Sequence, residues 1–134
     1  MRSRRSLQNR YSVAALPEVN ANMTRRVILR PQVPDDLQEI LLYLEQHSIE
    51  VADRFISSAW ATLEYLAQMP GMGSPKDFRS TVLKGIRSWA VRGFANYLVF
   101  YQTTADAIVI LAIVHGARNV RALLKARADS RRQG

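Results

Sequence analysis

The hydrophobic pattern of this chain changes its period at one place, the segment "PGMGSP" over residues 70–75. Before this segment, apolar residues recur at helical spacing, as on one face of an amphipathic helix. After it, apolar residues form short alternating or continuous runs that are separated by turn signals, which is typical of strands. Because proline and glycine end helices, the segment predicts a boundary between a helical half and a sheet half.

Two helices are predicted before the boundary. In residues 33–47 the apolar positions follow helical spacing, and Pro34 fits the first turn of a helix. Asp35 and Asp36 complement the helix dipole there, and we expect both on a solvated face. Residues 49–69 repeat the helical pattern with small side chains that permit close approach, so the two segments predict a helical hairpin.

Strands are predicted on both sides of this hairpin. Residues 25–30 form a short β-branched run, and residues 82–93, 94–102 and 107–115 form three further runs with turn signals between them. Residues 117–134 predict a basic helix that frays into a polar end. The fold class is therefore α+β: an N-terminal strand, a helical hairpin, a three-stranded antiparallel meander with helices on one face, and a C-terminal helix. Because the central strands are apolar on both faces, we expect a helix or a partner to cover the second face.

The 134 residues suit one domain. Residues 1–24 predict a flexible arm, with Met23 as an alternative start, residues 25–128 the folded domain, and residues 129–134 a polar tail. The chain has no cysteine, which excludes disulfides and cysteine zinc sites. Its longest apolar run, residues 107–114, is too short to cross a bilayer, so we expect a cytoplasmic protein without a membrane partner.

Charge is divided unevenly along the chain, whose net charge is +8. Seven of the 11 acidic residues lie within residues 31–69, whereas basic residues predominate from residue 70 onward. An uncompensated positive field attracts nucleic acid or an acidic protein segment. The C-terminal half is therefore the expected partner-binding half.

Conventional catalytic and cofactor motifs are missing from the sequence. The segment "GMGSPK" lacks the spacing of a phosphate-binding loop, and neither His47 nor His115 has a carboxylate at metal-ligand spacing. We therefore expect no metal and no cofactor. Arg87, Arg92 and Arg118 are more informative, because guanidinium groups bind phosphate or carboxylate and antiparallel strands would bring all three onto one concave surface.

The aromatic and polar residues near these arginines allow two interpretations. Trp89, Tyr97 and Tyr101 either offer stacking surfaces for bases or belong to the core. His115 stands at the end of an apolar strand, where it either makes structural hydrogen bonds or transfers protons. Asn119 is positioned to cap the last helix.

Two stretches together carry a family resemblance: "LKGIRSWAVRGFANYLVFYQ" (83–102) and "IVILAIVHGARN" (108–119). With the upstream "DLQEILLYL" and "TLEYLAQMPGMG", they resemble the ParE branch of the ParE/RelE superfamily of bacterial toxin–antitoxin toxins. The resemblance covers about residues 25–125. It implies a compact α+β fold, in agreement with the order of elements predicted from periodicity.

The resemblance also implies a choice between two activities, since RelE-like members cleave mRNA on the ribosome and ParE-like members poison DNA gyrase. Carried onto this chain, the RelE pattern gives Arg92 and Arg118 as positive positions. Leu98 stands where the nucleases have an arginine, Leu124 or its neighbours where they have an aromatic acid/base group, and Ala90 at a commonly basic position. The resemblance therefore implies a toxin without a catalytic residue that poisons DNA gyrase.

A toxin of this kind implies a cognate antitoxin that is acidic, partly disordered, folds on binding and forms a hetero-oligomer with it. The predicted partner-binding residues are Arg87, Trp89, Arg92, Arg118, Asn119, Arg121 and Lys125. For gyrase, the candidate contacts are the basic segment that carries Arg118, Arg121, Lys125 and Arg127, together with the loop Met69–Pro75.

Two alternatives remain open at this point. One is a ribosome-dependent mRNA endonuclease that uses Arg92, His115 and Arg118. The other is a non-toxic remnant that only binds an antitoxin. A cation such as Arg87 placed beside Arg118 and a proton donor would favour the nuclease.

Overall fold

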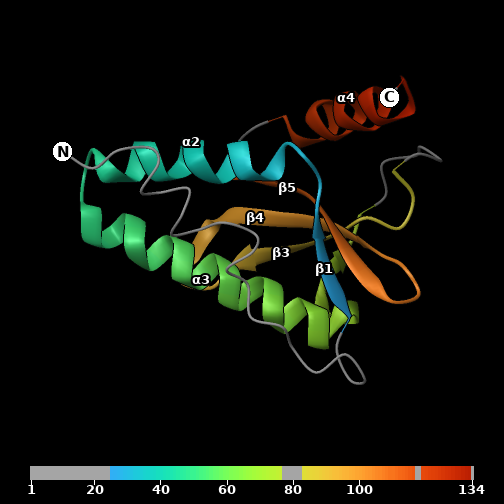
Figure 1. The fold of residues 1–134 in the computed structure, drawn as a ribbon, viewed down its shortest axis with the longest axis horizontal. Helices are drawn as coiled ribbons and strands as arrows, with labels where there is room; N and C mark the ends of the chain where they lie inside the picture. Colours follow the sequence, from blue (N-terminus) through green and yellow to red (C-terminus); the bar gives the residue numbers. More distant parts are fainter. Residues whose placement is uncertain (1–24, 77–82, 117–118, 134) are drawn as a thin grey trace.

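The structure is a computed structural model that describes residues 25–76, 83–116 and 119–133. Its elements, in chain order, are β1 (Arg26–Leu29), α2 (Val33–Glu45), α3 (Ile49–Gln68), the 3-10 turn η2 (Pro70–Met72), β2 (Ser74–Pro75), β3 (Arg87–Val91), β4 (Phe94–Thr103), β5 (Ala107–His115) and α4 (Val120–Gln133) (Figure 1). The strands form one sheet in the order β1-β5-β4-β3-β2. The predicted α+β class and the predicted order of elements are confirmed.

The sheet has two outer strands that the predicted meander did not include. β1 pairs in parallel with β5, from Arg26 opposite Ala107 to Leu29 opposite Ile110. Parallel strands need a long connection between the end of one and the start of the other, and here α2 and α3 form the first part of the connection from β1 to β5. At the other edge β2, which lies in the predicted loop, pairs with β3 through Ser74 opposite Ser88.

The larger core lies between one face of the sheet and the hairpin of α2 and α3. Phe55 on α3 is fully buried, and its ring packs edge-on against Phe94 at 5.0 Å and Tyr97 at 5.2 Å between ring centroids. Leu63 from the same helix and Tyr101 from β4 are also fully buried in this cluster. Burial of this apolar area supplies most of the driving force for folding.

The second face of the sheet is covered by α4. Leu124 is 2% exposed and packs in a smaller cluster with Phe100, Ala112 and Val114. The expectation that the helices share one face is therefore wrong. Without α4, the apolar side chains that β4 and β5 direct to this second face would be exposed to water. The expectation that a helix or a partner covers the second face is therefore confirmed.

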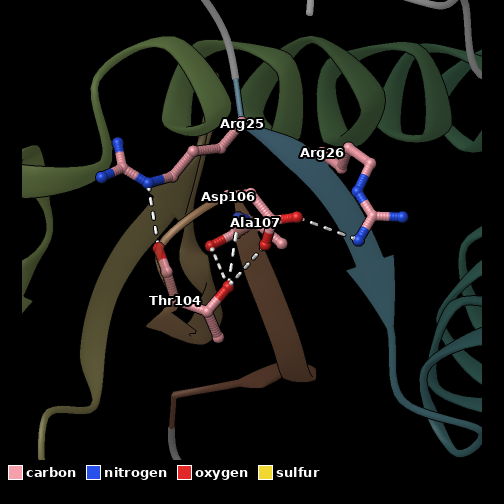
Figure 2. A network of polar contacts seen from close by, with 5 residues as sticks. All are labelled: Arg25, Arg26, Thr104, Asp106 and Ala107. Atoms are coloured by element: carbon pink, nitrogen blue, oxygen red, sulfur yellow. Dashed lines mark hydrogen bonds and ion pairs between the residues drawn. The ribbon is translucent and has the colours of Figure 1, made fainter.

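Figure 2 shows how β1 is fastened to the turn between β4 and β5. Arg25 donates from Nε to the Thr104 carbonyl at 3.1 Å, and Arg26 pairs with Asp106 at 3.4 Å. Thr104 in turn accepts the Ala107 N–H at its hydroxyl at 3.1 Å. These two arginines thus have partners within the chain. Within the described part of the chain, every helix is too short or too polar to span a membrane.

Candidate partner-binding site

A hollow of about 820 Å³ lies between the middle of α3 and the hairpin that joins β3 to β4; we name it the hairpin hollow. Its nine lining residues are Ala61, Thr62, Tyr65, Trp89, Ala90, Val91, Arg92, Gly93 and Ala95. Among these, the rings of Tyr65 on α3 and Trp89 on β3 lie 5.8 Å apart between their centroids. Trp89 is half-buried and packs against the larger core, while its use as a stacking surface stays a prediction.

The tip of the hairpin is held by α3. Thr62 accepts the Arg92 N–H at its hydroxyl at 3.0 Å and donates that hydroxyl to the Ser58 carbonyl at 2.7 Å. Gly93 has φ +79°, a conformation that side chains rarely adopt, which allows the chain to reverse within two residues. The backbone is therefore fixed while the exposed Arg92 side chain projects at the rim.

Arg87 lies at the opposite end of β3 and braces the loop 70–75. Its guanidinium donates to the Gly73 carbonyl at 2.7 Å and to the Gly71 carbonyl at 3.3 Å. The Tyr101 hydroxyl accepts the Gly73 N–H at 2.9 Å and donates to the Pro70 carbonyl at 2.7 Å. Burial raises the pKa of Tyr101, although the Gly73 N–H and Arg87 oppose the shift. Arg87 is therefore engaged by the loop of its own chain, and its predicted role in partner binding stays a prediction.

The braced loop displays two methionines. Met69 is 50% exposed and Met72 is 42% exposed. Gly73, which follows Met72 in the chain, is buried. A Cβ atom at this position would lie 2.8 Å from Tyr101 Cε1 and 2.9 Å from Arg87 Cβ. The tight contact needs glycine, and it holds the two apolar side chains at the surface.

His115 lines a separate hollow of about 300 Å³ beneath α2, which we name the α2 hollow. Its ring lies edge-on to that of Tyr97, with 5.2 Å between the centroids. Burial raises the pKa of Tyr97, and Tyr43 raises it further. Arg92 and His115 therefore line different hollows, so the structure does not assemble these two members of the alternative nuclease set. Arg118 lies outside the described residues.

One buried ion pair, which was not predicted from the sequence, fastens α4 to α2. Arg127 donates to both carboxylate oxygens of Asp36, at 2.5 Å and 2.8 Å, and to the Leu111 carbonyl at 2.9 Å. The other bond to Asp36 comes from the Ile113 N–H at 3.1 Å. In Figure 1, α4 begins near the end of α2 at which the chain enters that helix, and Asp36 belongs to the first turn of α2.

The ion pair satisfies backbone groups at an irregularity of β5. Phe100 faces Ala112 and Tyr101 faces Ile110, so Leu111 is an extra residue without a partner in β4. Arg127 donates to the Leu111 carbonyl and Asp36 accepts the Ile113 N–H, so the pair serves the backbone on either side of Ala112.

Two predictions about this pair are therefore wrong. Asp36 is 5% exposed, not part of a solvated face, and the Arg127 side chain is 17% exposed and engaged within the chain. A signal was present in the sequence, because Asp36 precedes Ile40 and Leu44 at intervals of four on the apolar stripe of α2. A charged residue on such a stripe needs a buried partner.

The remaining predicted residues that the structure describes lie on α4 or directly before it. Asn119 accepts the Ala122 N–H at its side-chain oxygen at 3.2 Å, so the predicted N-cap is confirmed. Arg121 and Lys125 are exposed, four residues apart on one side of the helix, whereas Leu124 faces the sheet. Among the residues that the structure describes, no cluster of three side chains suits a metal ion.

Comparisons with known proteins place this geometry in context. The family model described as ParE toxin of type II toxin–antitoxin system, parDE, matches residues 27–120. Toxin ParE2 of Mycobacterium tuberculosis is 33% identical over 104 residues, which cover 75% of this chain and 90% of that protein. Toxin ParE1 of Caulobacter vibrioides is 32% identical over 90 residues, which cover 66% of this chain and 86% of that protein.

A solved structure described as a chromosomal ParDE TA system from P. aeruginosa matches with a TM-score of 0.55 and 18% identity. The match covers 69% of this chain and 97% of that chain. At this identity the similarity shows a shared fold.

Proposed function

Because the chain belongs to the ParE family of toxins from type II toxin–antitoxin systems, we propose that it is a non-enzymatic toxin that poisons DNA gyrase and is neutralised by a cognate antitoxin. In this proposal the toxin binds gyrase in the cytoplasm and traps its DNA-cleavage complex, which blocks replication. The family match over residues 27–120 carries the proposal.

The site geometry supports a toxin that binds but does not cleave. Cleavage of RNA needs cations and a proton donor around one phosphate. Arg92 and His115 line different hollows, and Leu124, at the predicted acid/base position, is 2% exposed in the smaller core. Leu98 packs half-buried against the same core. The described residues therefore present binding surfaces without an assembled acid–base pair.

Two surfaces are candidate gyrase contacts. One is the outer side of α4, where Arg121 and Lys125 are exposed. The other is the loop that displays Met69 and Met72, since flexible thioether side chains on a fixed backbone suit a protein contact. Arg127 is not part of the first surface because Asp36 engages it.

The proposed antitoxin is acidic, partly disordered and ordered by binding. A chain with net charge +8 gains affinity and association rate from an acidic partner. Gene adjacency is the simplest supporting observation: a short reading frame for an acidic protein directly beside this one.

The test is supercoiling by purified gyrase with increasing amounts of the purified toxin. We expect loss of supercoiling and accumulation of cleaved DNA near stoichiometric toxin, and a weaker effect when Arg121→Glu and Lys125→Glu are combined. Lys84→Glu, a charge reversal at another exposed position, is the matched control and should act like the wild type. Full supercoiling at stoichiometric wild-type toxin removes the proposal, and cleavage of ribosome-bound mRNA by the same preparation would replace it with the nuclease.

A further inference from the structure

We propose that the outer edge of β3 and the hairpin hollow together bind an extended acidic segment of the antitoxin. The segment adds to the sheet beside Ala90, directs an apolar side chain into the hollow, and places a carboxylate at Arg92. This inference rests on the proposed function, because it names how the antitoxin of that proposal is held.

The first observation is that the outer edge of β3 is only partly paired. The Lys76 N–H donates to the Ile86 carbonyl at 2.9 Å, and Ser74 lies opposite Ser88. Because backbone groups alternate along a strand, the N–H and C=O of Ala90 face the same edge as those of Ile86 and Ser88. β2 begins only at Ser74, opposite Ser88, so it does not reach Ala90, and none of the described residues hydrogen-bonds to the Ala90 backbone on that side.

The open edge has a defined end. Beyond Ala90, the Arg92 N–H is already bound to the Thr62 hydroxyl at 3.0 Å. A segment added at this edge can therefore pair with Ala90 but not continue past Arg92. A short pairing of this kind gives main-chain affinity, and pockets for alternate side chains give it specificity.

The second observation is the hollow itself, which lies directly beside this edge. Its wall is apolar and aromatic, with Trp89 on β3 and Tyr65, 38% exposed, on α3. A volume of about 820 Å³ holds a large side chain from an added strand. Aromatic side chains that are partly exposed at a concave surface are the usual anchors of protein contacts.

The third observation concerns charge and selects the occupant. Among the nine described residues that line the hollow, Arg92 alone is charged, and it is exposed. An acidic segment satisfies this guanidinium, whereas a second copy of this chain would bring another molecule of net charge +8 against it. The occupant that fits is therefore an acidic partner, not a homodimer.

The test compares the affinity of the purified, full-length cognate antitoxin for four toxin variants by isothermal titration calorimetry. Arg92→Glu reverses the charge at the rim, and Ala61→Trp fills the hollow from an exposed position of α3. Lys84→Glu and Ser57→Trp are the matched controls, since both positions are exposed and neither lines the hollow. Circular dichroism establishes that each variant is folded.

We expect Arg92→Glu and Ala61→Trp each to weaken binding about tenfold or more, while the two controls stay within about twofold of the wild type. Hydrogen exchange of the Ala90 amide should slow in the complex. Inhibition of gyrase by the two hollow variants should equal that of the wild type, which separates this inference from the proposed function.

Unchanged affinity of both hollow variants would overturn the inference and leave the proposed function intact, as would an Ala90 amide that exchanges equally fast in the complex. If the wild-type toxin and the antitoxin do not bind each other, the proposed neutralisation fails first, and the inference fails with it.

Discussion

Arg127 and Arg92 differ in what surrounds them, although the sequence analysis assigned both to a basic binding surface. Arg127 is almost covered and is held by Asp36 and the Leu111 carbonyl. Arg92 is exposed at the rim of an apolar hollow, and its backbone, not its guanidinium, is the part that α3 fixes. The chain thus uses one arginine to close its own fold and leaves the other exposed. Net charge alone does not distinguish these two uses.

Among variants that distinguish the surroundings of Arg127 from those of Arg92, Asp36→Ala is expected to lower the free energy of unfolding most. This change leaves Arg127 buried without its carboxylate and removes the partner of the Ile113 N–H. Breaking a buried pair on one side costs about 3–5 kcal/mol. Urea unfolding measures the loss, with Asp35→Ala, an exposed neighbour in the same helical turn, as the control. A loss for Asp36→Ala no larger than that of Asp35→Ala would show that the pair does not hold α4.

A smaller effect is expected from Tyr101→Phe, which removes the hydroxyl that ties loop 70–75 to β4. The loss of these buried hydrogen bonds should cost about 1–2 kcal/mol in the free energy of unfolding. Gyrase inhibition should also weaken if the displayed methionines contact gyrase, since their loop loses its support. The matched control is Tyr65→Phe, whose ring is partly exposed on α3.

The same hydroxyl predicts a dependence on pH. Burial raises the pKa of Tyr101 in the folded chain above its value in the unfolded chain, so the folded state holds this proton more tightly. The resulting stability is present below the ordinary tyrosine pKa of about 10 and is lost as the pH rises through the folded pKa. Unfolding at several alkaline pH values should show a steeper loss for the wild type than for Tyr101→Phe, and equal slopes would contradict this account.

The smallest effect on stability is expected at Arg92. Because its side chain is exposed and the Arg92 N–H is kept in any variant other than proline, Arg92→Ala should change the free energy of unfolding by no more than about 0.5 kcal/mol. Arg127→Ala, the matched change at the other arginine, should cost several times more. Equal losses in urea unfolding would remove the distinction between the two regions.

The sequence predicted those parts of the fold that depend on local pattern. Apolar spacing gave α2 and α3, alternation gave β3, β4 and β5, and Asn119 was correctly placed as the N-cap of α4. The features it missed are non-local. The pairing of β1 with β5 joins segments about 80 residues apart, and Arg127 lies 91 residues from Asp36.

The lining of the candidate site was also predicted only where it depends on residues that are close in the sequence. Trp89 and Arg92 do share the hairpin hollow, because they lie on one strand and the turn that follows it. The contacts of Arg87 within the chain could not be predicted, because the Gly71 and Gly73 carbonyls belong to a loop whose position depends on Tyr101 in another strand. Residue type predicted which side chains carry charge, but only the tertiary contacts show which charges are already used.

The measurement that tests the proposed function most directly is expression of the toxin in bacteria without its antitoxin, with the DNA-damage response and protein synthesis followed in parallel. A gyrase poison should induce the DNA-damage response first, while ribosome-bound messages stay intact. Cleavage of those messages and early arrest of translation, without any DNA-damage response, would contradict the account and assign the chain to the nuclease branch.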